Sequence, residues 1–137
     1  MIDFTYEADF ELINPNHHVE WIQNALQEEG FEEGDINYIF CDDEYLHKLN
    51  VEFLDHDTLT DIISFDYTMG KLISGDIFIS VERVFDNAKD LNIDFRDEMN
   101  RVMIHGILHY CGYKDKQPDD VRVMRSKEDY YIAKIAK

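Results

Sequence analysis

The chain has 137 residues, 45% of them hydrophobic, and a formal net charge of −17 at pH 7. This composition excludes a disordered tail, and the length predicts one compact domain over residues 1–137 that buries on the order of two-thirds of its unfolded surface. An acidic chain of this kind lacks the broad basic patch of most nucleic-acid-binding proteins, so any contact with RNA must depend on a local feature, such as a bound cation, or on a partner.

The first half of the chain predicts strands that alternate with helices. Apolar and polar side chains alternate over residues 2–6, as in an opening strand. Pro15 begins a helix with apolar residues at helical spacing. Residues 35–41 predict a second strand, and Asp42 or Asp43 could cap a short helix that follows it.

The second half of the chain is mainly helical. Residues 62–65 and 72–80 predict two further strands, which would form a hairpin or a neighbouring pair. Three helices are then predicted over residues 81–91, 95–111 and 118–135. The expected fold is α+β, with a small mixed sheet of about four strands packed with about five helices, and helix 95–111 against the sheet.

Helix 95–111 carries a candidate metal site near its end. His105 and His109 are one helical turn apart, so both imidazoles can direct a nitrogen at one ion. Gly112 is placed to end the helix, and Asp115 could return toward the same point as a third ligand. The pattern HxxxHxxGxxD predicts a metal site, although turn-spaced histidines also occur as core or partly exposed residues. Three protein ligands leave a coordination position open, which favours hydrolysis over a purely structural ion.

Gly106 stands where zinc proteases of the HExxH type carry a catalytic glutamate. Its presence argues against peptide hydrolysis of that kind. A residue this small would let a strand or a bulky substrate approach the helix closely, and plain helix-on-sheet packing explains it equally well.

Two cysteines, Cys41 and Cys111, form neither a CxxC pair nor a disulfide framework. We expect two buried, reduced thiols. Cys111 is a possible competitor for a ligand role because it follows His109 by two residues, but Asp115 has the better spacing.

The sequence shows neither a membrane-spanning segment nor a signal peptide, and this predicts where the protein is located. No apolar run approaches the roughly 20 residues that cross a bilayer. The N-terminal stretch MIDFTYEADFELINP has acids where a signal peptide needs a basic end. We therefore expect a cytoplasmic protein with no membrane contact.

The segment HGILHYCGYKD, residues 105–115, resembles the signature of the YbeY family of rRNA-maturation endoribonucleases, HGxLHxxGYDH, in which three histidines bind zinc. Upstream, LTDIISF at 59–65 is similar to the family's TDVLSF-type strand, and GDIFIS at 75–80 is similar to its GD-apolar strand. The resemblance extends over nearly the whole chain. It implies the family's fold, one zinc ion, and a role in processing or quality control of ribosomal RNA.

The chain departs from the family pattern at the third ligand, where Asp115 replaces a histidine, and Lys114 replaces the preceding aspartate. Zinc with two neutral histidines and one carboxylate has a net charge of about +1, where three histidines leave about +2. Attraction for phosphate should therefore be weaker, although this ligand set still suits zinc and could admit another first-row divalent metal.

A second departure lies before the TDVLSF-like strand. The family has an arginine there that is thought to assist RNA cleavage, and this chain has Leu54. His56 could substitute in part, or could be a solvent-exposed loop histidine. The family also follows this strand with proline, where Asp66 stands here.

The first functional hypothesis is a metal-dependent, single-strand endoribonuclease acting on rRNA, with zinc bound by His105, His109 and Asp115. The substrate would approach along strand residues, although the same residues could serve only as a strand cap and as sheet packing. These candidate substrate-binding residues are Thr60, Asp61, Ser64 and Phe65, together with His56. The sequence shows no clear general base, no arginine for the transition state and no basic groove.

The second hypothesis is a non-catalytic ribosome-assembly adaptor with a structural metal site. The acidic surface favours this alternative, since it can meet basic ribosomal proteins directly. In either case the expected partners are rRNA and ribosomal proteins or assembly factors.

Overall fold

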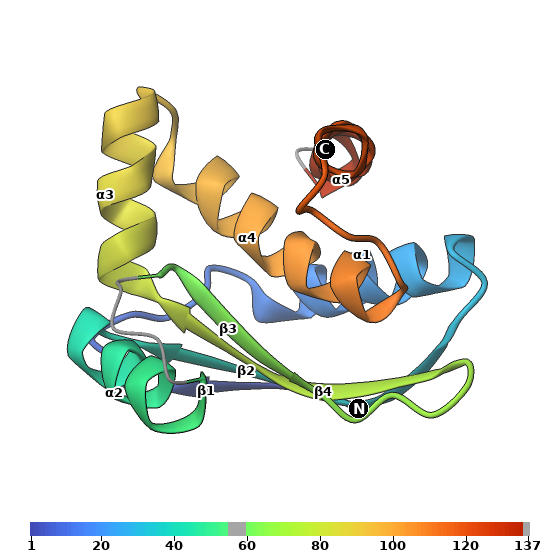
Figure 1. The fold of residues 1–137 in the computed structure, drawn as a ribbon, viewed down its shortest axis with the longest axis horizontal. Helices are drawn as coiled ribbons and strands as arrows, with labels where there is room; N and C mark the ends of the chain where they lie inside the picture. Colours follow the sequence, from blue (N-terminus) through green and yellow to red (C-terminus); the bar gives the residue numbers. More distant parts are fainter. Residues whose placement is uncertain (55–59, 136–137) are drawn as a thin grey trace.

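The computed structural model describes residues 1–54 and 60–135 and shows an α+β fold in which helices cover a four-stranded sheet (Figure 1). In chain order the elements are β1 (Ile2–Tyr6), α1 (Pro15–Glu28), β2 (Glu32–Cys41), α2 (Asp43–Leu54), β3 (Ile62–Asp66), β4 (Leu72–Ser80), α3 (Val81–Leu91), α4 (Phe95–Tyr110) and α5 (Pro118–Ile135). The expected fold class, a mixed sheet of four strands with five helices, is confirmed for the described residues.

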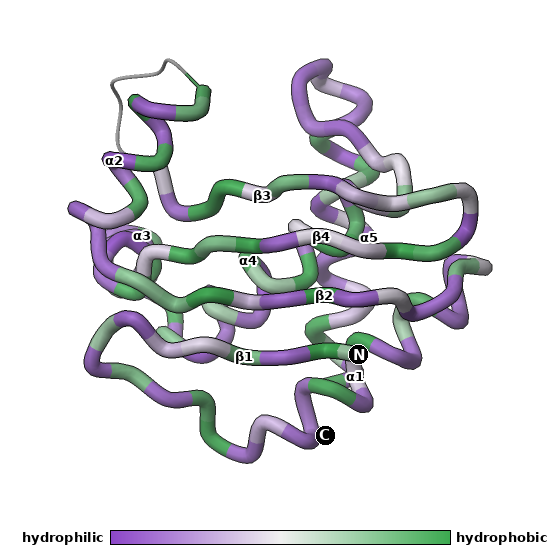
Figure 2. The backbone as a smooth tube through the Cα atoms, turned by 90° about the horizontal axis from the view of Figure 1, so that it is seen from below, coloured by the Kyte–Doolittle hydropathy of each residue, from purple (hydrophilic) through white to green (hydrophobic). Residues whose placement is uncertain are grey.

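The sheet has the strand order β1-β2-β4-β3, which Figure 2 shows from the side opposite to most of the helices. β1 pairs in parallel with β2, and β2 pairs in parallel with β4. β3 and β4 form the predicted hairpin and are antiparallel. β3 is therefore an edge strand, and α4, which carries His105 and His109, passes above it.

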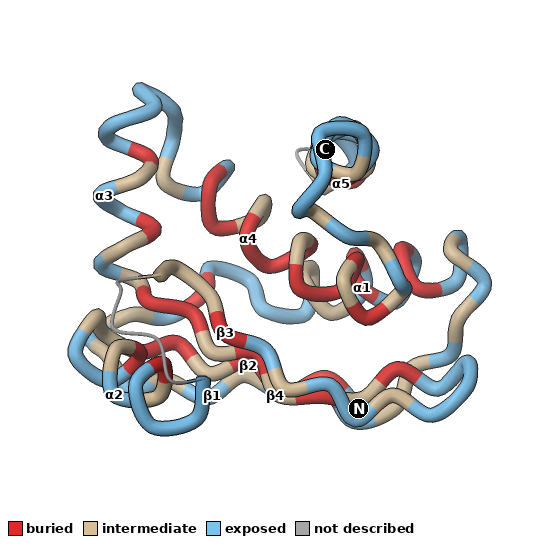
Figure 3. The backbone as a smooth tube through the Cα atoms, in the orientation of Figure 1, coloured by how far each residue is buried: buried red, intermediate tan, exposed pale blue. Residues whose placement is uncertain are grey.

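The main core lies between the sheet and the helices on one of its faces. Alternate residues of β2 and β4 point to that face, among them Tyr38, Phe40 and Ile77, and are fully buried there. In Figure 3 the buried positions gather on the strands and on the side of α4 that faces them. On the opposite face, α2 covers a smaller cluster formed by Cys41, Leu46 and Ile63. This arrangement places α4 centrally, with the sheet below it and α5 beside it.

Apart from β3, which extends one residue beyond its predicted end to Asp66, two predicted boundaries differ from the structure. β2 begins at Glu32, three residues before the predicted start at Asp35, because Glu32 and Glu33 pair with β4 through a register shift that no local pattern indicates. α4 ends at Tyr110, with Cys111 as the capping residue. Both differences fall at element ends, which tertiary pairing decides more than local preference does.

Two local features position α4. Asp94 caps its N-terminus, and Gly106 lets it pack closely on the sheet. The Asp94 side chain accepts a hydrogen bond of 2.7 Å from the Arg96 backbone amide at the start of the helix. A Cβ atom at Gly106 would lie 3.0 Å from Ile77 and 3.2 Å from Ile62. Of the two explanations for this glycine, close packing of the helix on the sheet is therefore the one the structure supports.

Within the described residues, no helix has both the length and the apolar character needed to cross a bilayer.

Candidate metal centre

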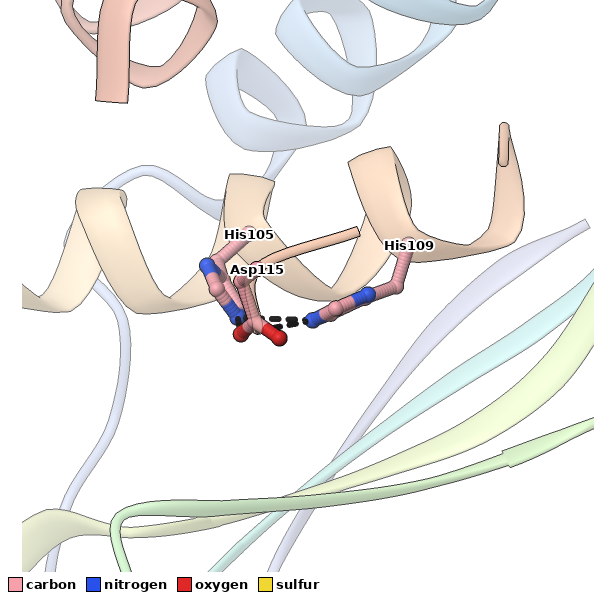
Figure 4. Close-up of side chains that lie close together, drawn as sticks. All are labelled: His105, His109 and Asp115. Atoms are coloured by element: carbon pink, nitrogen blue, oxygen red, sulfur yellow. Dashed lines mark hydrogen bonds and ion pairs between the residues drawn. The ribbon is translucent and has the colours of Figure 1, made fainter. Parts of the chain in front are cut away.

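Three side chains from α4 and from the loop after it converge on one point (Figure 4). The Nε2 atoms of His105 and His109 lie 2.9 Å apart, and each lies 3.1 Å from Oδ2 of Asp115. Gly112, with φ of 103°, turns the chain back after α4 and so makes the approach of Asp115 possible. Among the described residues, these three form the one group of His, Cys, Asp and Glu side chains with spacing suited to a metal ion.

The other nitrogen of each imidazole has a partner that fixes the tautomer. Nδ1 of His105 lies 2.7 Å from Oε2 of Glu128, and Nδ1 of His109 lies 2.9 Å from the carbonyl oxygen of Tyr113. Both partners accept hydrogen bonds, so both Nδ1 atoms donate and, in the neutral form of each ring, the Nε2 lone pair points inward. Two imidazole lone pairs and a carboxylate oxygen then face one another without a donor between them, which is an arrangement that suits a cation.

The donor set fits zinc. Ligands at about 2.0–2.1 Å from a tetrahedral ion are about 3.3 Å from one another, close to the spacing of these three atoms. The side chains of His105, His109 and Asp115 are 22%, 32% and 36% exposed. The centre is thus held by protein on one side and accessible to solutes on the other.

Glu128 of α5 links His105 to a buried charge network. The carboxylate is buried, and its Oε1 accepts a hydrogen bond of 2.9 Å from Arg101, which also binds Asp129 at 2.8 Å. Burial alone would lower the pKa of His105, but the hydrogen bond to Glu128 and the charges of Glu128, Asp115 and Asp61 raise it overall. Burial would raise the pKa of Glu128, yet its bonds to His105 and Arg101 keep it below the ordinary value. The carboxylate therefore remains ionised and holds the ring in place.

A hollow of about 330 Å³ adjoins the centre between α4, α5 and the start of β3. Its wall includes two of the three proposed ligands, His105 and Asp115, so a solute in the hollow would lie next to a bound ion. The remaining charged residues of the wall are Asp61, Glu98, Arg101, Arg125 and Glu128.

The structure separates the other residues that were predicted to contact substrate. Asp61 lines the hollow, whereas the hydroxyl of Thr60 donates to the backbone carbonyl of Ile62 at 3.3 Å. Ser64 is exposed farther along β3. Phe65 lies on the opposite face of the sheet, where its ring packs against Phe53 and Phe78. His56 lies outside the described residues.

Burial raises the pKa of Asp61, the predicted substrate residue that lines the hollow, although its hydrogen bonds and the charge of His105 act in the opposite direction. Its carboxylate accepts one long hydrogen bond, 3.4 Å, from Asn87. Because Asp61 lines the same hollow as His105 and Asp115, it is placed to accept a hydrogen bond from a solute in the hollow.

Two other residues singled out in the sequence lie away from the centre. Cys111 caps the C-terminus of α4, and burial raises the pKa of its thiol to about 12. Leu54 is the last residue of α2, on the far side of the sheet from α4, and is 42% exposed. Cys41 and Cys111 are both free thiols.

The sequence analysis missed Glu128, Arg101 and Arg125. One signal was present: Met124, Glu128 and Tyr131 follow one another at helical spacing and are all buried in α5. A carboxylate on a buried stripe needs a charged or hydrogen-bonding partner. The sequence could therefore have indicated that Glu128 has a partner, but not that the partner is His105.

A second carboxylate, Glu29, anchors the loop that carries Asp115. It accepts hydrogen bonds from the hydroxyl groups of Tyr113 and Tyr131 and from Lys127 at 3.1 Å. Burial would raise the pKa of Glu29, but these three donors lower it below the ordinary value of 4.5. Its stabilising effect is therefore complete above about pH 4.5 and is lost as the pH falls through the lower pKa of the folded state.

We accordingly expect Glu29→Gln to lower the free energy of unfolding by about 1–3 kcal/mol at pH 7, because hydrogen bonds to a charged acceptor are weakened. The difference between the variant and the wild type should shrink below about pH 4.5, where the wild-type carboxylate also becomes neutral. Urea unfolding across this pH range measures both values, with Glu20→Gln on α1, the helix that Glu29 caps, as the control. A difference that does not depend on pH would contradict the assignment.

Comparisons with known proteins agree with the resemblance inferred from the sequence. The family model described as Endoribonuclease YbeY matches residues 4–136. A protein named Endoribonuclease YbeY from Flavobacterium johnsoniae is 64% identical over 97% of this chain and 96% of its own length. A protein of the same name from Flavobacterium psychrophilum is 56% identical over 94% of this chain and 92% of its own length.

A solved structure shows the same fold. The solution structure of TM1509 from Thermotoga maritima matches with a TM-score of 0.74 and 26% sequence identity, over 98% of this chain and 89% of that one. The family model and the two relatives each cover nearly the whole chain. The chain therefore belongs to the endoribonuclease YbeY family.

Proposed function

We propose that this protein is a metal-dependent endoribonuclease that cleaves single-stranded RNA during maturation and quality control of ribosomal RNA. The observation that carries the proposal is the convergence of His105, His109 and Asp115, all partly exposed, beside a hollow whose wall includes His105 and Asp115. Relatives that are 64% and 56% identical carry the name Endoribonuclease YbeY, which supports the same activity.

The proposal assigns a role to each residue of the centre. His105, His109 and Asp115 hold one zinc ion, and Glu128 and the Tyr113 carbonyl hold the two rings in the tautomer that leaves Nε2 free. When bound, zinc would supply a Lewis acid that stabilises negative charge on phosphate oxygens. Asp61 would accept a hydrogen bond from the RNA strand in the hollow.

The acidity of the chain favours a second role, as an adaptor that contacts basic ribosomal proteins or assembly factors. A purely structural ion would need no open side, whereas the three ligands here are 22–36% exposed. We therefore rank the enzyme above the adaptor. The cytoplasmic location stays a prediction from the sequence.

Removal and return of the metal test the proposal. Protein purified without an affinity-metal column should contain about one zinc ion per chain. Chelation should abolish cleavage of single-stranded rRNA fragments, and added zinc should restore it. Circular dichroism before and after chelation separates the two roles, because an enzyme of this design keeps its fold without the ion. Cleavage that persists after chelation, or global unfolding of the metal-free chain, would contradict the proposal.

A further inference from the structure

The hollow beside the metal centre is unfavourable for RNA unless cations offset its acids. Four carboxylates belong to its wall, those of Asp61, Glu98, Asp115 and Glu128. One of them, Glu98, is buried and its Oε1 atom has no hydrogen-bond partner. A divalent ion together with both arginines of the wall would only bring the hollow close to neutrality. Since phosphate binding depends on positive charge, each guanidinium group in the hollow matters.

Arg101 is already committed to protein carboxylates. Its Nη1 atom donates to Glu128 at 2.9 Å and its Nη2 atom to Asp129 at 2.8 Å, and its side chain is only 21% exposed. Nε of the same group lies 3.9 Å from Glu98. A guanidinium group with its donors directed at three acids has little capacity left for a substrate.

Arg125, unlike Arg101, is exposed and makes no close contact with a carboxylate. Its side chain is 57% exposed, and the one ion pair that it forms with the described residues is a contact of 3.7 Å between Nη1 and Oε1 of Glu128. That distance exceeds a hydrogen bond. Because Arg125 precedes Glu128 by three residues on α5, it lies on the same flank of the helix as the carboxylate that holds His105. Among the described residues no hydrogen bond holds its guanidinium group, which is therefore open to solvent beside the metal centre.

We propose that Arg125 binds a phosphate group of single-stranded RNA at the mouth of this hollow, next to the metal centre. The proposal rests on the proposed function and adds the residue that holds the RNA backbone. Guanidinium groups bind phosphate through two parallel hydrogen bonds, and this one needs no rearrangement of an existing bond to do so. Of the two arginines in the hollow's wall, it is the more exposed to solvent.

The test compares Arg125→Met and Arg125→Lys with a matched control, Arg122→Met. Arg122 lies on the same helix, is 76% exposed and pairs with Asp119, outside the wall of the hollow. The probe is a short fluorescent 2′-O-methyl oligouridine, whose backbone charges are those of RNA and whose modified sugars resist cleavage. Binding to zinc-loaded protein is measured by fluorescence anisotropy over a range of salt concentrations, and circular dichroism verifies the fold of each variant.

We expect Arg125→Met to weaken binding about tenfold and to reduce the slope of log affinity against log salt by about 0.7, the contribution of one phosphate contact on a single strand. Arg125→Lys should retain the slope and lose part of the affinity, since lysine keeps the charge without the fork. Arg122→Met should match the wild type.

Equal binding by Arg125→Met and Arg122→Met would overturn the assignment, as would a wild-type protein that does not bind the probe. Cleavage of unmodified RNA is measured in parallel. A wild type that binds the probe through Arg125 but never cleaves would leave the assignment intact and refute the proposed function. Cleavage whose KM is unchanged in Arg125→Met would refute the assignment alone.

Discussion

Replacing His109 by alanine is expected to lower zinc affinity by more than about 100-fold and to abolish RNA cleavage without unfolding the protein. His109 supplies one of the three converging donor atoms, and loss of a ligand should exceed the 10- to 100-fold effect of losing a residue that only orients a ligand. Its side chain is 32% exposed, and outside its contacts with His105 and Asp115 it makes one hydrogen bond, to the Tyr113 carbonyl, so the free energy of unfolding should change by no more than about 1 kcal/mol.

Zinc content by elemental analysis, cleavage of single-stranded rRNA and urea unfolding of the metal-free protein measure the three effects. His17→Ala, which removes a histidine of α1 away from the metal centre, is the matched control and should behave as the wild type. Stoichiometric zinc in the His109 variant would show that this side chain is not a ligand. Cleavage without zinc in that variant would indicate a contaminating nuclease.

The sequence predicted the parts of this site that local geometry determines. Two histidines one turn apart lie on the same side of a helix whatever surrounds it, and Gly112 could end that helix in the left-handed conformation that few other residues adopt. Asp115 is only three residues farther on, so few arrangements of the loop are available to it. The spacing alone was therefore enough to predict that His105, His109 and Asp115 would meet.

The predicted substrate-binding surface on β3 conflicts with strand geometry. Ser64 and Phe65 are consecutive in β3, and consecutive side chains in a strand point to opposite faces of the sheet. Phe65 belongs to the cluster under α2, so the pair could not have lined one approach to α4. The alternation was visible in the sequence, but which of the two residues faced the metal helix required the packing of α2.

The rest of the site forms where α5 packs against α4. Its residues are too far apart in the sequence for local patterns to predict their contacts. Glu128 meets His105 across 23 residues, and Arg101 meets Glu128 across 27. The same docking brings Arg125 to the hollow, in a chain whose sequence had indicated no arginine for the transition state. Position on a distant helix, set by packing of Met124 and Tyr131, thus decides which charges surround the candidate metal centre.

Glu128 is the residue outside the ligand set whose replacement should affect the metal most. Glu128→Gln retains an oxygen that can accept from Nδ1 of His105 but loses the charge, and we expect about tenfold weaker zinc binding. Glu128→Leu removes the acceptor as well and leaves the mostly buried Arg101 with Asp129 and the more distant Glu98 as its remaining acids. For this variant we expect about 100-fold weaker zinc binding and a loss of about 3 kcal/mol in the free energy of unfolding.

Competition with a chromophoric chelator measures zinc affinity, and urea unfolding of the metal-free variants measures stability. Asp129→Asn is the control, because Asp129 also binds Arg101 but is 60% exposed and does not contact His105, so its loss should leave zinc affinity unchanged. If Asp129→Asn and Glu128→Gln weakened zinc binding equally, the effect would come from Arg101 and not from the orientation of His105. Unchanged zinc affinity in both variants would mean that α4 alone holds His105 in place. In that case α5 would contribute to the binding of substrate and not to the binding of zinc.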